Sequence, residues 1–325
     1  MPGMSANKQT TQLVVKEPAN YVNPFVGTDG FGNVYPGAQL PFGGIQISPD
    51  TDEHYYDCAS GYKWNRNSIQ GFSLTHLSGT GIPDLGDFLF MPGVGEPMLE
   101  PGTDDKPDTG YRSRFSHDEE TAVPGYYSVQ LKDYGVKAEM TAAMRSGMFR
   151  FTYPKSDKAF VLIDMNHTLW QKCVWSNLRV ENDSTITGYK LVKGWGPERH
   201  IYFRAVFSKP FADFMIYQDK KPVIYNTSRF RSNREAWGPN LLFTANFKTS
   251  EGEQVTVRTA ISATGTDGAA VNIKELAGKS FDAVRSAAYD KWNKELSRYS
   301  IQGTTEQILH LCLPRSALSF RLRRR

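Results

Sequence analysis

Residues 126–165 read YYSVQLKDYGVKAEMTAAMRSGMFRFTYPKSDKAFVLIDM, and their pattern decides the fold class. Apolar and polar residues alternate within short runs, and the turn signal Asp133–Gly135 separates the first run from the second. Such alternation is typical of half-buried β-strands. Ten runs of this kind lie between residues 88 and 262: FLFMP, YYSVQL, KAEMTAA, MFRFTY, AFVLIDM, STITGYKLV, HIYFRAVFS, FMIYQ, LLFTANF and QVTVRTAIS. We therefore predict a mainly β fold, an antiparallel β-sandwich.

Near residue 280 the hydrophobic period changes from two to between three and four residues. In SFDAVRSAAYDKWNKELSRY, residues 280–299, the apolar positions fall on one face of a helix: Phe281, Val284, Ala288, Trp292 and Leu296. Ser280 is a suitable N-cap. The pattern fits two alternatives, a surface helix packed on the sandwich or a linker helix that leads into a second domain.

These patterns divide the chain into four predicted regions. Residues 1–19 are a polar, flexible lead-in, residues 20–275 form the β-sandwich domain, and residues 276–303 form the linker helix region. Residues 304–325 look aberrant or truncated, because they carry a helix-breaking proline and end in RLRRR without a closing element. We expect this last segment to be poorly packed.

Composition excludes several classes of protein. Of the 325 residues, 39% are hydrophobic and 13% aromatic, which suits a globular chain with β-structure and contacts to flat ligands. The net charge of +4 comes from the four arginines of the tail, so no basic face for nucleic acid is indicated. Three dispersed cysteines indicate neither a disulfide framework nor a zinc ribbon. No apolar run is long enough to span a membrane.

The N-terminus lacks the apolar core of a signal peptide. The chain is therefore either cytoplasmic or lacks its signal peptide in this form, and its sequence does not separate the two.

The segment GFSLTHLSGTG, residues 71–81, concentrates glycines and hydroxyl side chains around His76. A phosphate loop is not indicated, because the chain has neither GxxxxGK[ST] nor GxGxxG in a strand–helix context. A hydrolase nucleophile elbow would need GxSxG, whereas this segment has LSGTG. The spacing of His54, His76, Asp84 and Asp87 fits no common set of metal ligands.

Aromatic residues cluster just before this segment. They are Tyr55, Tyr56, Tyr62 and Trp64, and Trp195 follows later in GWGPERH. Aromatic faces pack on the apolar face of a sugar ring while hydroxyl and amide groups bind its hydroxyls. Each of these aromatics would equally suit the core of the sandwich, but their clustering between residues 55 and 87 favours a sugar site.

The motifs NPFVGT, NVYPGA, THLSGTG and FSKPF occur in this order. Together with GYKW they make residues 20 to about 305 resemble the N-terminal part of glycoside hydrolase family 92, the calcium-dependent exo-acting α-mannosidases. The resemblance implies a β-sandwich followed by a linker helix and an (α/α)6 barrel, which this chain lacks. It also implies an inverting mechanism that acts on α-mannosidic bonds of N-glycans or mannan, and a secreted or periplasmic location.

By this resemblance, the sandwich contributes loops to the wall of the sugar pocket, and the partner is a mannose-containing glycan. The expected wall residues are Asn33, Tyr62, Trp64, His76, Ser78, Gly79 and Thr80. In the family, a second histidine often stands where Leu74 is here, so a role for a histidine pair is not carried over.

The catalytic carboxylates and most of the calcium site come from the barrel in the family, so no catalytic or metal-binding residue is named in this chain. We expect the chain alone to be inactive. The alternative function is a non-catalytic carbohydrate-binding sandwich.

Overall fold

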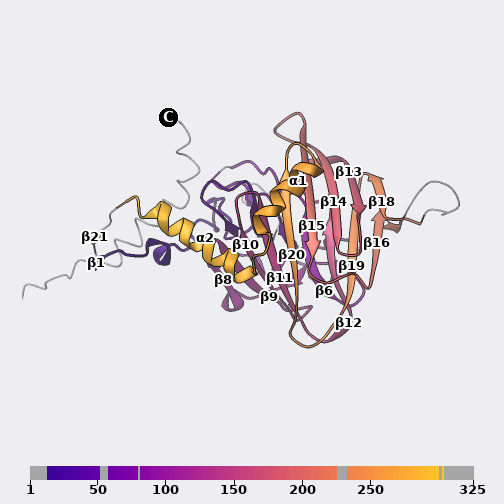
Figure 1. Cartoon of the computed structure of the whole chain (residues 1–325), viewed down its shortest axis with the longest axis horizontal. Helices are drawn as coiled ribbons and strands as arrows, with labels where there is room; N and C mark the ends of the chain where they lie inside the picture. Colours follow the sequence, from indigo (N-terminus) through magenta and orange to yellow (C-terminus); the bar gives the residue numbers. More distant parts are fainter. Residues whose placement is uncertain (1–12, 52–57, 80, 225–232, 300–301, 304–325) are drawn as a thin grey trace, which may run out of the picture.

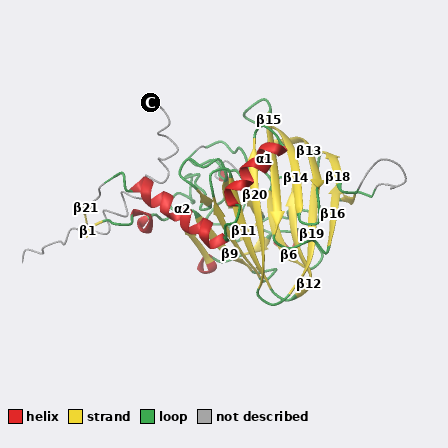
Figure 2. Ribbon diagram, in the orientation of Figure 1, coloured by secondary structure: helices red, strands yellow, loops and turns green. Residues whose placement is uncertain are grey.

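The computed structural model describes residues 13–51, 58–79, 81–224, 233–299 and 302–303. Two large antiparallel sheets form a sandwich, and the helices lie on the outer face of one of them (Figures 1 and 2). All ten runs predicted from alternation fall on strands of these two sheets. The predicted antiparallel β-sandwich is confirmed.

The first sheet has nine strands. In spatial order they are β18 (Glu235–Gly238), β13 (Lys172–Val180), β14 (Thr185–Lys193), β15 (Arg199–Phe207), β20 (Glu253–Ser262), β11 (Ser146–Tyr153), β10 (Val136–Ala142), β9 (Tyr126–Leu131) and β8 (Glu120–Val123).

The second sheet has eight strands. In spatial order they are β17 (Lys221–Pro222), β16 (Asp213–Gln218), β19 (Leu241–Thr249), β12 (Ser156–Asp164), β6 (Leu89–Val94), β5 (Gly71–Ser73), β3 (Gln46–Asp50) and β2 (Ala38–Gln39). Two short ribbons accompany the sheets, β4 (Ser68–Ile69) with β7 (Ser113–Arg114), and β1 (Leu13–Val14) with β21 (Gln302–Gly303).

The core lies between the inner faces of the two sheets. Phe90 of the second sheet packs against Phe149 of the first with ring centroids 5.0 Å apart. Phe88 similarly contacts Phe203 at 4.5 Å. Since alternate residues of a strand point to opposite faces, the period-two pattern places these apolar side chains inside.

Two α-helices follow the last long strand. α1 (Thr266–Asn272) packs on β20 and β15, and the 3₁₀ turn η5 (Ile273–Leu276) leads on to α2 (Phe281–Leu296). All five residues of the predicted apolar face of α2 are buried, and Ser280 Oγ accepts a hydrogen bond from the Ala283 N–H at 3.2 Å. The predicted helix after the sandwich and its N-cap are therefore confirmed.

The remaining short 3₁₀ turns lie in loops, at Pro18–Tyr21 (η1), Pro107–Thr109 (η3) and His117–Glu119 (η4). The η1 turn packs beneath α2, where the Ala19 N–H donates to Asn293 Oδ1 at 2.9 Å. The chain before the sandwich is thereby fastened to the helix that follows it. The predicted tail, residues 304–325, lies outside the described residues.

Candidate functional site

The hydroxyl-rich segment after β5 forms a loop whose two ends are joined. The Leu74 N–H donates to the Asp87 carbonyl and the Gly86 N–H to the Thr75 carbonyl, both at 2.9 Å. These bonds close a loop between Thr75 and Gly86. The loop therefore projects from the sandwich on a fixed base, which suits a binding surface.

His76 lies buried at this base, in a network centred on Asp50. Its Nε2 lies 2.7 Å from Asp50 Oδ1, and its Nδ1 donates to the Gln46 carbonyl at 2.8 Å. His167, from the loop after β12, approaches the other carboxylate oxygen of Asp50 through Nε2 at 2.9 Å. Both imidazoles and the carboxylate are fully buried.

The Asp50 carboxylate is held in its ionised form. Burial would raise its pKa, but the charges and hydrogen bonds of His76 and His167 outweigh burial and hold the pKa below its usual range. Gly61 makes room for this group, since a Cβ there would lie 2.1 Å from Asp50 Oδ1. We conclude that His76 fixes the base of the loop rather than reaching out of it.

A second buried carboxylate, Asp87, ties the loop to the first sheet. Arg199 donates to both of its oxygens, at 2.6 and 3.1 Å, and the Lys190 ammonium lies 3.6 Å away. Thr75 Oγ1 also donates to Asp87 at 2.7 Å. Burial opposes ionisation of Asp87, but Lys190 and Arg199 outweigh it and lower its pKa.

Asn33 connects the glycine-rich loop of residues 27–34 to two other segments. Its carbonyl accepts from the Gly79 N–H at 2.7 Å, and its Oδ1 accepts from the Ala59 N–H at 3.3 Å. Its φ of 51° lies in the left-handed region, which asparagine tolerates better than most residues. The structure therefore brings together Asn33, Gly79 and the segment that leads to Tyr62 and Trp64.

Tyr62 is buried and holds its own loop. Its hydroxyl donates to Glu120 Oε2 at 3.0 Å, and Tyr127 and His117 bind the same carboxylate. Burial, the largest influence, raises the pKa of Glu120 in spite of these hydrogen bonds. Tyr62 thus lies beneath the surface that it was predicted to form.

Trp64 is partly buried and stacks on His117, with ring centroids 3.7 Å apart and planes within 6°. Phe25 meets the indole edge-on at 5.2 Å. The backbone N–H of Trp64 donates to the Thr28 carbonyl at 3.0 Å, so Trp64 belongs to the same group of loops as Asn33.

Ser78 borders a small cavity of about 50 Å³ that Tyr35 and Trp292 of α2 also line.

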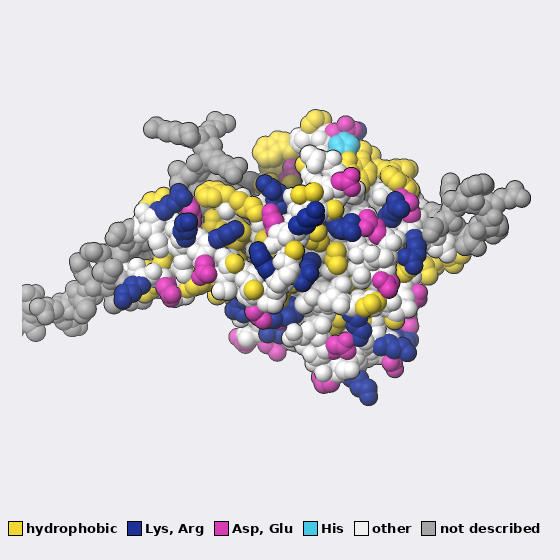
Figure 3. Space-filling view, viewed as in Figure 1, with side chains coloured by type: hydrophobic (Ala, Val, Ile, Leu, Met, Phe, Trp, Pro, Cys, Tyr) yellow, Lys and Arg dark blue, Asp and Glu magenta, His cyan; other side chains and the backbone are white. Residues whose placement is uncertain are grey.

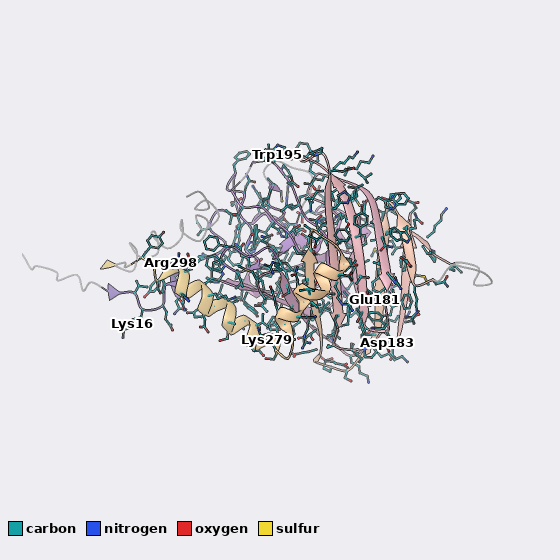
Figure 4. All side chains as sticks on the ribbon, turned by 45° about the horizontal axis from the view of Figure 1, so that its top comes forward. Lys16, Glu181, Asp183, Trp195, Lys279 and Arg298 are labelled. Atoms are coloured by element: carbon teal, nitrogen blue, oxygen red, sulfur yellow. The ribbon has the colours of Figure 1, made fainter. Side chains whose placement is uncertain are left out.

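Trp195 is 67% exposed in the hairpin between β14 and β15, at the opposite end of the sandwich from Glu181 and Asp183 (Figure 4). Arg199, four residues after Trp195, links its hairpin to Asp87. Thr80, Tyr55, Tyr56 and His54 lie outside the described residues.

The sequence reasoning did not identify Asp50, Lys190 or His167 as members of the site. One signal was available for Lys190, which stands at an inward-facing position of the alternating run STITGYKLV and is fully buried. A lysine at such a position requires a buried anion. Which anion it meets depends on the tertiary fold.

Within the described ranges, no group of three or more His, Cys, Asp or Glu side chains is arranged to hold a metal ion. His76 and Asp87, two of the residues considered as ligands, are engaged with Asp50 and with Arg199 instead. The described helices include none that is long and apolar enough to cross a membrane.

The described residues thus form a two-sheet sandwich that holds the loops of Asn33, Trp64 and Gly79 together through backbone hydrogen bonds. The chain belongs to glycosyl hydrolase family 92, since residues 21–262 match the model of that family's N-terminal domain.

Solved structures agree with this assignment. A family GH92 α-mannosidase from Bacteroides thetaiotaomicron, in complex with mannoimidazole, is 68% identical, with a TM-score of 0.87, over 89% of this chain and 38% of that chain. A second structure of that enzyme gives 64% identity and a TM-score of 0.90 over 94% of this chain and 40% of the other. A family GH92 inverting mannosidase from Bacteroides thetaiotaomicron VPI-5482 is 25% identical, with a TM-score of 0.75, over 91% of this chain and 38% of that chain.

An uncharacterized secreted glycosidase of Arthroderma benhamiae is 32% identical over 143 residues, which are 42% of this chain and 17% of that protein. The chain thus spans only about 40% of the α-mannosidases that it resembles.

Proposed function

We propose that this chain is the N-terminal domain of an inverting α-mannosidase and that its loop end forms one wall of the mannoside pocket. The observation that carries the proposal is the identity of 64–68% to an α-mannosidase over 89–94% of the chain. The substrate is then a mannose-containing glycan such as an N-glycan or mannan.

The wall consists of the loops that carry Asn33, Trp64, Ser78, Gly79 and Thr80. Asn33, Trp64 and the backbone of Gly79 are the groups closest to the ligand, whereas Tyr62 and His76 position the wall from below. Burial supports this division, since Gly79 is exposed, Trp64 is partly exposed and Asn33 is 9% exposed, whereas Tyr62 and His76 are each 1% exposed. Glycine in the wall lets the main chain approach a sugar closely.

An inverting glycosidase needs a general acid and a general base about 6.5–9.5 Å apart, one on each side of the glycosidic bond. The buried carboxylates near the loop end, Asp50, Asp87 and Glu120, are each engaged with cationic or hydroxyl groups of the sandwich. We therefore propose that both catalytic carboxylates, and the calcium that the resemblance implies, belong to the part of the longer enzymes that this chain does not cover.

The test compares this chain with a chimera. The chimera joins the chain to the remaining C-terminal part of the Bacteroides thetaiotaomicron α-mannosidase, and release of mannose from an α-linked mannobiose is measured with calcium present. We expect turnover by the chimera, inversion of the anomeric configuration by NMR, loss of activity with a chelator, and no turnover by the chain or the C-terminal part alone. A folded chimera without turnover would contradict the proposal.

In the chimera, Trp64→Ala should weaken substrate binding by about 1–3 kcal/mol, or about 5- to 150-fold, because an aromatic contact with the sugar is lost. Trp64→Phe should retain part of the affinity, since a ring still stacks on His117. The readout is the Kd for mannoimidazole, together with the urea midpoint of each variant. If Trp64→Ala lowers stability but leaves the Kd of folded molecules unchanged, Trp64 supports the sandwich and does not form the wall.

A further inference from the structure

The outer face of the nine-stranded sheet carries an aromatic band that the proposed function does not use. It consists of two rows of side chains that cross the strands. The first row is Trp237, Asn177, Tyr189 and Tyr202, and the second is Trp175, Leu191 and His200. Residues paired across neighbouring strands project on the same side of a sheet, so each row lies on one face.

The two tryptophans of this band are well exposed, and its other three rings contact one another, while Asn177 between Trp237 and Tyr189 is only 7% exposed. Trp175 and Trp237 are 44% and 55% exposed. The Tyr189 ring lies 5.0 Å from that of Tyr202 and stacks on that of His200 at 5.8 Å. The Tyr189 hydroxyl is also 3.2 Å from His200 Nδ1. The space-filling view shows hydrophobic side chains gathered along the upper edge of this face (Figure 3).

The first row ends at a cleft of about 780 Å³ between α1 and the ends of β15 and β20. Ser262, which pairs with Tyr202, lines this cleft together with His200, Thr264 and Asn272. Two arginines also line it, but each has a carboxylate partner, Asp87 for Arg199 and Glu275 for Arg145. Clefts of this size that combine apolar walls with a few hydroxyl and amide groups are typical of small-molecule sites. The band and the cleft therefore form one continuous surface, a flat aromatic platform with a polar recess at its end.

We propose that this surface binds a neutral oligosaccharide chain, with its sugar rings stacked on the band and its end in the cleft. No Lys, Arg, Asp or Glu stands in either row; charged residues begin only in the next positions, such as Arg179 on one side and Lys193 on the other. A polyanion would need cations within the band. A neutral ligand with apolar ring faces and many hydroxyls matches this arrangement.

The size of the band favours a sugar chain over a protein partner. With strands about 4.8 Å apart, four strands span about 14 Å, and two rows are separated by about 7 Å along the strands. The Cα grid beneath the band is thus a narrow strip of about 14 Å by 7 Å, which suits a chain-like ligand, whereas a stable protein interface buries roughly 800 Å² of accessible surface per partner.

The aromatic band shares no residue with the proposed mannoside wall, although Arg199 of the cleft also bonds to Asp87 at the base of the wall loop. Binding to the band requires no turnover. Only the choice of α-mannan as first probe rests on the proposed function. The test therefore uses the 325-residue chain itself, in native gels that contain soluble α-mannan, β-glucan or xylan. A failed mannosidase assay and a failed glycan-binding assay can then be distinguished.

We expect α-mannan in the gel to slow the migration of the chain, and we expect this retardation to be the same at low and at high salt. Trp175→Ala and Trp237→Ala should each weaken binding by about tenfold, and the double variant should abolish it. Trp170→Ala is the matched control, because Trp170 is also exposed, at 47%, but lies neither in the rows nor in the cleft. All three positions are at the surface, so the urea midpoints should not change.

Retardation by β-glucan or xylan but not by α-mannan would still support a site for neutral glycans, but it would show that mannose is not its ligand. Three results would overturn the proposal: no retardation by any glycan, retardation that the double variant leaves intact, or binding that high salt removes, which would indicate a polyanion. Self-association that Trp175→Ala or Trp237→Ala abolishes, without glycan binding, would show that the band is a contact between protein copies.

Discussion

Replacing Asp87 by alanine is expected to destabilise the sandwich by about 3–5 kcal/mol, measured as the free energy of unfolding in urea. The reason is the Lys190 ammonium, which is fully buried between the sheets and lies 3.6 Å from Asp87. Without the carboxylate, this ammonium has lost its buried counter-ion, and a buried charge without one is among the most unfavourable consequences of a single substitution. Arg199 loses two hydrogen bonds in the same variant.

Two further variants separate this explanation from a general loss of packing. Adding Lys190→Met to Asp87→Ala should recover part of the stability, because the double variant no longer buries a lone charge. Asp183→Ala removes an exposed carboxylate from the turn between β13 and β14 and should change stability by no more than about 0.5 kcal/mol. An Asp87→Ala variant as stable as Asp183→Ala would show that Lys190 does not depend on Asp87.

Asp87→Ala should also loosen the part of the domain that carries the Thr75–Gly86 loop. Asp87 joins the base of the Thr75–Gly86 loop to Arg199, which also binds Gln171 Oε1 at 3.0 Å. The Asp87 carboxylate thus links this loop to β15 and, through Arg199, to the segment before β13. We expect faster amide exchange in residues 74–87 of Asp87→Ala than in the strands β10 and β11, which are distant from this contact.

The elements that could be predicted from the sequence are those with a local cause. Each of the ten alternating runs forms a strand because period-two patterning gives a strand one apolar face, regardless of which strand pairs with it. The apolar face of α2 followed from its 3.6-residue period in the same way. The turn at Asp133–Gly135 connects β9 and β10 in a hairpin, as its residue types indicated.

Elements that depend on distant contacts could not be predicted in this way. β13 was missed because a bulge between Cys173 and Trp175 interrupts its alternation. The short strands β2 to β5 lie among glycines and prolines, and their partners are set by tertiary packing. The site shows the same limit, since Asp50 and His167 are 117 residues apart. The motif around His76 indicated a special loop, but its residue types did not show that the imidazole faces inward.

Replacing Asp50 by alanine is the second large expected effect, a loss of about 3–5 kcal/mol in the free energy of unfolding. The substitution removes the acceptor that His76 and His167 share, and both imidazoles are fully buried beside it. It also opens a space next to Gly61, which has no side chain to fill it. Asp50→Asn keeps the shape of the group and should destabilise less, by about 1.5–3 kcal/mol, because one acceptor oxygen remains although the charge and the other acceptor are lost.

The pH dependence of Asp50→Asn tests whether the charge is responsible. The pKa of Asp50 is lowered in the folded state, so its ionised form contributes stability above the unfolded-state pKa of about 3.9. That contribution is lost as the pH falls from there through the lower, folded-state pKa. The stability difference between wild type and Asp50→Asn should therefore shrink below about pH 4. The measurement is urea unfolding at a series of pH values, and a difference that stays constant down to the strongly acidic limit would mean that shape and hydrogen bonding, rather than the buried charge, hold His76 and His167 in place.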